Sequence, residues 1–477
     1  MKSTRLFAGL LGLCAGALAA SAAEEMIPVA FSTKWMNPSA DPRQDFYEYA
    51  NGGWLKATEI PGDKSRWGAF DALGENNWRR IRGILEEAAT KSGPAGSIGQ
   101  QVGDFYASAM DEAAIDAAGL KPLQPELARI DALTNLDDLI RYIAEAQDRI
   151  CSPLFGSYIY ADQKDNSRVV FILTQGGLSL PSRDYYFEPQ YAKFLAPFTE
   201  HVAKMLVLAG AAPEAAQADA ARILALETEM ARISKTVAEL RDPLANYHLL
   251  TRAEAAAKMP GFPLAVYLDA AGLPASEQQI NVAQLEYFTG LGALLTAKPL
   301  AEWKAYLRWH ALSASAPYLA KEFNAENFRF FGNVLNGTPS QEPRWQRAAR
   351  VLDGRIGFAV SRIYVDRYFP PAVKARLEEM IQNMRDVLHD RIVALDWMSE
   401  PTKRKALEKL TTFRVVVGYP EKWRDYTGLE IRRDDYFGNV TRGAVFEAKR
   451  QLAKLGKPFD RSEWVRTPQQ VNAYYQP

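Results

Sequence analysis

The chain has 477 residues, of which 48% are hydrophobic and 24% are charged, a composition typical of a soluble globular protein with a large core. Lysine and arginine together number 57, as do aspartate and glutamate, so the formal net charge is zero. This balance argues against a protein that binds nucleic acid or an anionic membrane through a strongly basic surface. The length is sufficient for two or three domains.

The N-terminus has the three parts of a secretory signal peptide. Lys2 and Arg5 precede an apolar run at 6–20, and small residues continue to Ala23. The apolar run is too short for a transmembrane helix, and no later stretch is apolar enough to span a bilayer. We therefore expect residues 1–23 to be removed and the mature protein to be exported, to the periplasm or the extracellular space. The alternative interpretation of this segment is a buried N-terminal helix.

The chain contains two cysteines. Cys14 lies inside the signal segment, and Leu13 occupies the position at which a lipoprotein signal would carry a small residue, so cleavage near Ala23 is expected instead. Cys151 is then the only cysteine of the mature chain and cannot form an internal disulfide.

Apolar residues recur at intervals of three or four along most of the chain, which is the pattern of amphipathic helices. The pattern predicts helices at 76–89, 101–110, 136–148, 223–237 and 377–395, and a further helix from about residue 401. Segments 157–160 and 169–173 are β-branched or aromatic and flank a polar turn, which predicts a hairpin. A further strand is predicted at 413–418. The fold class is therefore mainly α with minor β.

The common catalytic signatures are missing from the sequence. None of the four histidines is followed by glutamate, so no H-E-x-x-H helix exists in these 477 residues. His310 stands among aromatic residues and is interpreted as a packed helix histidine. The chain also has no phosphate-binding loop, no dinucleotide-binding glycine motif and no nucleophile elbow. Without further information the residues describe an exported helical protein with no recognisable catalytic site.

Several longer sequence motifs, spread along the chain, resemble those of a known protein family. They begin with D-F-Y-E-Y-A-N-G-G-W at 45–54 and continue with V-G-D-F-Y at 102–106, L-P-S-R-D-Y-Y at 180–186, E-L-R-D-P at 239–243, G-Y-P at 418–420 and V-N-A-Y-Y at 471–475. These phrases resemble, in the same order, those of the neprilysin and endothelin-converting-enzyme family of zinc metallopeptidases. The resemblance covers the chain from about residue 35 to its last residue.

The family has two lobes around a central cavity, a helical lobe that admits only short peptides and a thermolysin-like α/β lobe that holds zinc. The resemblance implies that 24–60 contributes to the catalytic lobe and that 61–400 forms the helical, peptide-restricting lobe. Residues 401–477 would be a linker helix and the incomplete beginning of the catalytic lobe. Because that lobe would be absent, we expect residues after about 400 to expose apolar faces and unpaired strand edges.

The resemblance also implies four substrate-binding residues. Asn472 and Ala473 match the pair that aligns a substrate backbone, through the Asn side-chain amide and the Ala carbonyl. Arg66 matches an arginine that holds the C-terminal carboxylate of short peptides, for which a guanidinium is suited. Asp71 matches a carboxylate that orients this arginine, and Gly74 stands where the family has a second arginine. Without the resemblance these positions would be a surface arginine, a helix N-terminal acid and a loop.

Zinc is the cofactor of the family, held by the two histidines of H-E-x-x-H and a later glutamate, while the glutamate of the motif activates water. All of these residues are missing from the chain, which ends inside the phrase that starts at Val471. We therefore expect no metal ligands, no catalytic residues and no hydrolysis by this polypeptide alone. Two hypotheses remain, a truncated member of the peptidase family and a non-catalytic exported peptide-binding protein. In both, the expected partners are short peptides rather than nucleic acid.

Overall fold

The computed structural model describes residues 26–91 and 93–475, so the predicted signal peptide at 1–23 lies outside the described residues. About 60% of the chain is helical and 5% is strand, which confirms the mainly α fold with minor β. The helices of eight or more residues are α1 (Phe46–Ala57), α2 (Ala69–Lys91), α3 (Ile98–Met110), α5 (Gln124–Asp131), α6 (Leu136–Gln147), α7 (Leu195–Leu208), α8 (Pro213–Ile233), α11 (Leu285–Ala297), α12 (Leu300–Ser315), α14 (Arg344–Tyr368), α15 (Pro371–Ala394), α16 (Glu400–Thr412) and α17 (Tyr436–Leu452). Shorter helices are α4 (Glu112–Ala118), α9 (Arg252–Lys258), α10 (Leu264–Ala270) and α13 (Lys321–Asn327), and a π-helical turn spans Phe328–Leu335.

The strands form one small sheet in the order β1-β2-β4-β3. The predicted hairpin is confirmed, since β1 (Phe155–Ala161) pairs antiparallel with β2 (Val169–Gln175). Strand β4 (Gln279–Val282) runs parallel to β2 and antiparallel to β3 (Leu249–Thr251). The turn of the hairpin is closed by the buried carboxylate of Asp162, which accepts hydrogen bonds from the backbone N–H of Lys164 and the guanidinium of Arg168.

Two details of the predicted elements are wrong. The helix expected at 223–237 ends at Ile233, because the backbone of Ser234 is extended and the N–H of Lys235 donates to the side chain of Gln175 at 2.8 Å. Val237 lies outside the helix and is 46% exposed. The strand expected at 413–418 is irregular. No described strand runs beside this segment, so its β-branched residues have no ladder to join.

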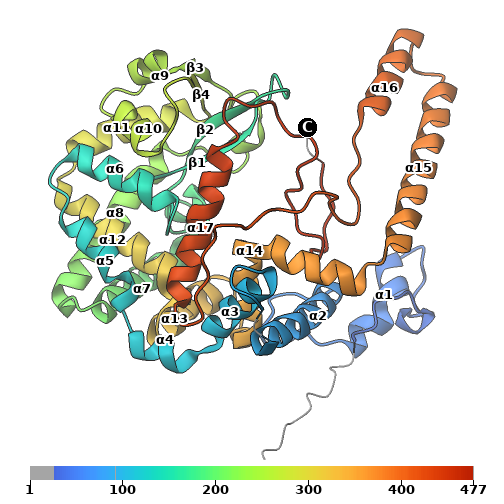
Figure 1. Ribbon diagram of the computed structural model, residues 1–477, viewed down its shortest axis with the longest axis horizontal. Helices are drawn as coiled ribbons and strands as arrows, with labels where there is room; N and C mark the ends of the chain where they lie inside the picture. Colours follow the sequence, from blue (N-terminus) through green and yellow to red (C-terminus); the bar gives the residue numbers. More distant parts are fainter. Residues whose placement is uncertain (1–25, 92, 476–477) are drawn as a thin grey trace, which may run out of the picture.

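The helices enclose two main hydrophobic cores. The larger core contains the sheet and the helices from α5 to α13, with Trp303, Trp309 and Tyr287 fully buried. The second core lies where α2, α3 and α14 pack together with residues 426–440. Helix α17 lies between the two cores (Figure 1), because Tyr436 belongs to the second core whereas Leu452 packs against the first.

Helices α2 and α3 approach each other closely at Gly103. A Cβ atom at this position would lie 2.2 Å from the carbonyl oxygen of Ala88, which is well inside van der Waals contact. Backbone cannot move aside as a flexible side chain can, so the helices can keep this distance only with glycine at 103.

Gly103→Ala should therefore destabilise the protein by about 1–3 kcal/mol, through overpacking of the α2–α3 crossing. The matched control is Gly83→Ala on α2, where a Cβ atom would meet nothing within 4 Å. That substitution should raise stability by up to about 1 kcal/mol, since alanine is the better helix former. Urea unfolding of both variants measures the difference, and equal stability of the two would contradict this description of the crossing.

Helices α15 and α16 form an arm that projects from the rest of the molecule (Figure 1). Neither helix has a buried residue. Met384 on α15 is 64% exposed and Trp397, between the helices, is 74% exposed. The apolar exposure expected after about residue 400 thus begins earlier, at the start of α15.

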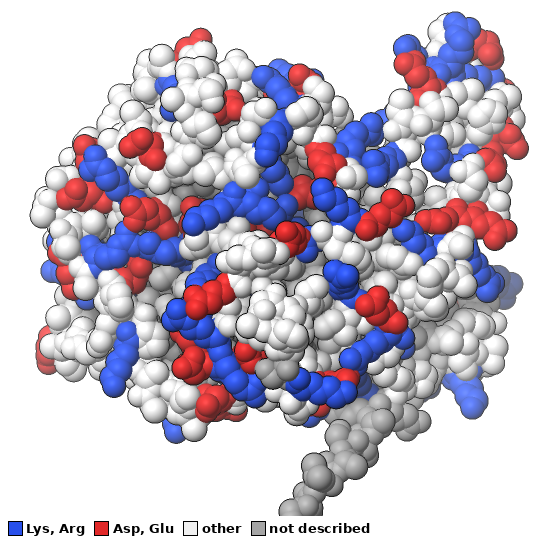
Figure 2. Space-filling model, in the orientation of Figure 1, with Lys and Arg blue, Asp and Glu red and all other residues white. Residues whose placement is uncertain are grey.

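No helix within the described residues is both long and apolar enough to cross a membrane. Basic and acidic side chains are interspersed over the face shown in Figure 2, consistent with the balanced composition.

Candidate substrate-binding site

The structure brings Arg66 and Asp71 together at the start of α2. Asp71 lies in the first turn of the helix, and its Oδ1 is 3.7 Å from Nε of Arg66 in the preceding segment. The Arg66 side chain is 85% exposed and that of Asp71 is 29% exposed. Asp71 thus lies near one edge of the guanidinium, while most of the Arg66 side chain remains accessible to a ligand.

The segment that carries Arg66 is tied to the loop before α14. Lys64 Nζ lies 2.6 Å from Oε1 of Glu342, which also accepts a hydrogen bond from Arg350. Burial would raise the pKa of Glu342, but the hydrogen bonds from Arg350 and Lys64 lower it below its usual value. The backbone N–H of Ser340 donates to the carbonyl of Gly62 at 3.0 Å. These contacts fix the backbone on the N-terminal side of Arg66.

Gly74 lies three residues after Asp71 and therefore on the same face of α2. A Cβ atom at Gly74 would meet no atom within 4 Å. There is room at this position for the second arginine implied by the resemblance, but the chain provides no side chain there. The site thus has one guanidinium, that of Arg66, at this end.

Asn472 and Ala473 lie in an irregular, exposed segment after α17. The Oδ1 atom of Asn472 accepts a hydrogen bond from the backbone N–H of Ala473 at 2.8 Å. Further along, the ring of Tyr475 contacts that of Phe413, with centroids 5.7 Å apart. The side-chain NH₂ of Asn472 has no hydrogen-bond partner within residues 26–91 and 93–475, so it is free to donate to a ligand.

Helix α2 connects the two halves of the predicted site. The Asn77 side chain donates to the carbonyl oxygen of Gln469 at 2.9 Å, three residues before Asn472. Asn77 follows Asp71 by six residues, or about 9 Å of helical rise. Arg66 and Asn472 do not contact each other directly. Arg66 immediately precedes α2, and Asn472 follows the segment that Asn77 of α2 binds at Gln469.

Gln469 holds the C-terminal segment in place. Its buried side chain accepts a hydrogen bond from Ser361 at 2.7 Å and donates to Asp353 at 2.5 Å. Burial raises the pKa of Asp353, and the hydrogen bonds from Gln469 and Gln470 oppose this increase. Because Ser361 and Asp353 lie on α14, this glutamine joins the segment before Asn472 to the second core.

Gln469→Ala should lower stability by about 1–3 kcal/mol, because it leaves buried polar groups without partners. The segment 470–475 should then be cleaved by proteases well before the helical body. Gln470→Ala is the matched control, since Gln470 is exposed and makes one long contact of 3.4 Å to Asp353. Limited proteolysis followed by mass spectrometry measures the cleavage of segment 470–475 in the two variants. Equal protection of this segment in both would contradict the role of Gln469 in holding it to α14.

A buried polar cluster in the larger core was not predicted from the sequence. The fully buried carboxylate of Glu227 on α8 accepts hydrogen bonds from Tyr186 and Ser179, at 2.5 and 2.6 Å, and lies 3.2 Å from Nε2 of His310. Burial and the carboxylate raise the pKa of Tyr186 well above its usual value, so the phenol remains a donor. The L-P-S-R-D-Y-Y phrase thus stabilises the core, and His310 is packed on α12 as predicted, 4.2 Å from the Tyr306 ring.

Within the described residues, no group of three or more His, Cys, Asp or Glu side chains is arranged to hold a metal ion. The buried His201 is paired with Glu326 through Nδ1 at 2.8 Å and stacks on Phe330. The zinc site that the resemblance implies for the family therefore does not fit the donors in this part of the chain.

Comparisons with known proteins identify the class to which this fold and these residues belong. Residues 42–420 match the model of peptidase family M13, and the chain belongs to that family. The inhibitor complex of the zinc metalloprotease Zmp1 of Mycobacterium tuberculosis is 36% identical, covers 94% of this chain and 68% of its own, and superimposes with a TM-score of 0.89. The open state of that protein gives a TM-score of 0.81.

Endothelin-converting enzyme 1 of Cavia porcellus is 30% identical over 466 residues. The alignment covers 93% of this chain but 61% of the relative, so the chain spans less than two thirds of that protein's length. PepO of a lactobacillus, at 22% identity and a TM-score of 0.83, shares the fold. The predicted resemblance to the neprilysin and endothelin-converting-enzyme family is thereby confirmed.

Proposed function

We propose that this chain supplies the peptide-selecting lobe and one edge of the substrate site of a zinc peptidase of family M13. The observation that carries the proposal is the connection of both predicted half-sites through α2. Arg66 and Asp71 lie at its N-terminus, and Asn77 holds the segment that leads to Asn472.

In this proposal the two half-sites recognise different parts of one short peptide. Arg66 binds the C-terminal carboxylate through its exposed guanidinium, and Asp71 restricts the orientation of that group. Asn472 and Ala473 align the peptide backbone through the side-chain NH₂ and the main-chain carbonyl. With Gly74 in place of a second arginine, the carboxylate is held by a single guanidinium.

The division into lobes follows the family. Residues 24–60 and 401–477 contribute to the catalytic lobe, and 61–400 forms the helical lobe. The exposed apolar faces of α15 and α16 would lie against the catalytic lobe of a longer protein, because apolar surface of this extent is rarely left in water.

A peptide-binding assay tests the recognition. A fluorescent tetrapeptide with a free C-terminal carboxylate should bind saturably, and the same peptide as its C-terminal amide should bind about 10-fold more weakly. Equal affinity for the acid and the amide would contradict the role given to Arg66.

The second candidate is a non-catalytic exported peptide-binding protein, favoured by the exposed Arg66 guanidinium and the lack of a metal-binding group among the described residues. Sequencing the DNA beyond the Pro477 codon in all three frames separates the two. A continuation with H-E-x-x-H and a later acidic motif supports the peptidase. Unrelated sequence in every frame supports the binding protein.

We further propose that residues 1–23 direct export. Mass spectrometry of periplasmic or secreted material should show a mature N-terminus between Ala23 and Met26. Recovery of the protein from the cytoplasm with Met1 intact would contradict this proposal.

A further inference from the structure

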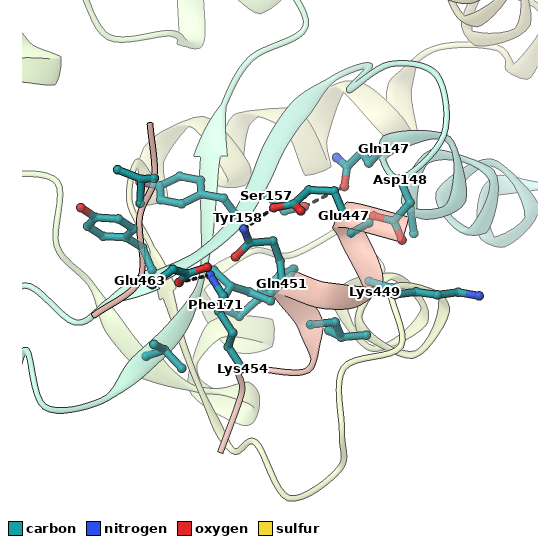
Figure 3. Close-up of a pocket in the computed structure, with 18 of the residues that line it drawn as sticks. Gln147, Asp148, Ser157, Tyr158, Phe171, Glu447, Lys449, Gln451, Lys454 and Glu463 are labelled. Carbon is teal, nitrogen blue, oxygen red and sulfur yellow. Dashed lines mark hydrogen bonds and ion pairs between the residues drawn. The ribbon is translucent and has the colours of Figure 1, made fainter. Parts of the chain in front are cut away.

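A cavity of about 470 Å³ lies between the β1–β2 hairpin, the end of α6 and helix α17 (Figure 3). Its walls carry four aromatic side chains, Tyr158, Tyr160, Phe171 and Phe459. This volume is within the range of small-molecule sites, which combine apolar walls with a few polar groups. The cavity is distinct from the Arg66 and Asn472 half-sites, none of whose residues line it.

The walls of the cavity are fixed by hydrogen bonds. Gln147 at the end of α6 accepts hydrogen bonds from the hydroxyls of Ser157 and Tyr267, at 2.9 and 2.6 Å. On the opposite side the backbone N–H of Phe459 donates to Ser167 at 2.9 Å, and its ring lies 6.3 Å from that of Tyr160. A ligand would therefore enter a largely preformed space.

Two of the three carboxylates on the wall are already neutralised. Glu447 accepts two hydrogen bonds from Arg450, at 2.8 and 2.7 Å. Glu463 accepts one from Arg450 at 2.5 Å and pairs with Lys454 at 2.6 Å. Lys449 extends away from the other labelled side chains in Figure 3.

Asp148 is the third carboxylate and has a different environment. Asp148 is exposed and has no ion pair within the described residues, while partial desolvation against the cavity wall raises the pKa of its carboxyl group. It is also the C-cap of α6, where the helix dipole places partial negative charge. A negative side chain at this end of a helix is unfavourable unless a cation lies close to it.

We propose that the cavity between β1 and α17 binds a ligand that carries a primary ammonium on an aromatic or apolar body. The ammonium pairs with Asp148 at the end of α6, and the body packs against the aromatic walls. Both a free aromatic amine and the N-terminal residue of a peptide have this chemistry. The site would select a positive group, whereas Arg66 selects a negative one.

Titration calorimetry of the chain with tyramine tests the proposal. Tyramine should bind with a Kd of about 1 mM, as expected for a ligand of roughly ten heavy atoms. N-acetyltyramine, which lacks the charge, should bind at least about 10-fold more weakly, since a charge-assisted contact is lost. A parallel titration with tyrosyl-alanine amide distinguishes the two kinds of ligand. If it binds more tightly than tyramine, the ligand is the N-terminus of a peptide; if it binds more weakly, the ligand is a free aromatic amine.

Asp148→Asn should weaken tyramine binding at least about 10-fold. Its folding should be undisturbed, because the substitution removes an unfavourable charge from a helix C-terminus. Asp137→Asn, at the other end of α6, is the matched control and should bind tyramine as the unmodified chain does. Ala271→Trp, which places an indole in the cavity from its wall, should abolish binding. Absence of tyramine binding, or equal affinity of the Asp148→Asn and unmodified chains, would overturn the proposal.

Discussion

Replacing Arg66 with alanine should weaken the binding of a short peptide with a free C-terminal carboxylate by about 30-fold, equivalent to about 2 kcal/mol. The guanidinium is exposed and Asp71 lies 3.7 Å from its Nε atom, so a peptide carboxylate can bind the other edge through two parallel N–H groups. The amidated peptide should bind the variant and the unmodified chain equally. Fluorescence anisotropy with both peptides measures the two effects.

Two further variants complete this test. Arg43→Ala removes another exposed arginine, one that is paired with Asp41 outside the proposed site, and should leave binding unchanged. Arg66→Lys keeps the charge but not the planar fork and should recover only part of the affinity. If Arg66→Ala and Arg43→Ala bind the free acid equally well, the carboxylate is recognised elsewhere.

Replacing Glu227 with alanine should lower the free energy of unfolding by about 3–5 kcal/mol. The carboxylate is fully buried and accepts hydrogen bonds from Tyr186 and Ser179, while His310 approaches from α12. Its removal leaves three polar groups in the larger core without their acceptor, in addition to a cavity.

Glu229→Ala is the matched control on the same helix. Its carboxylate pairs with Lys298, and both side chains are about a quarter to a third exposed, so the loss should be about 0–1 kcal/mol. Urea unfolding at neutral pH compares the two variants. A loss below about 1 kcal/mol for Glu227→Ala would show that the cluster contributes little to stability.

Those helices and strands whose formation depends on the local spacing of apolar residues could be predicted from the sequence. Long apolar stripes at helical spacing located α8 and α15, shorter helical patterns located much of α2 and α6, and two β-branched runs around a polar turn located the hairpin. The predicted strand at 413–418 failed because a strand needs a neighbour, and sequence pattern does not show whether one is present. The end of α8 was misplaced because the chain turns to an extended conformation at Ser234 and Lys235 bonds to Gln175 of β2, a tertiary contact that periodicity does not show.

The prediction of the candidate site depended much more on the resemblance to the peptidase family than on local sequence pattern. Nothing in composition or spacing distinguishes Arg66 from any other surface arginine, and its approach to Asp71 appears only once α2 has formed. The hydrogen bond from Asn77 to Gln469 joins residues 392 positions apart, so local sequence gives no sign of it. Glu227 was missed for the same reason, because its partners Ser179, Tyr186 and His310 lie 41 to 83 positions away from it in the sequence.

We propose that this polypeptide recognises short peptides but does not hydrolyse them. The most direct test incubates the purified chain with a short peptide and zinc, and follows the peptide by mass spectrometry while the bound metal is measured. We expect saturable binding of an intact peptide and far less than about one zinc ion per chain, since a catalytic zinc site needs three protein ligands in one place. Cleavage that a chelator abolishes, accompanied by about one bound zinc per chain, would contradict this proposal.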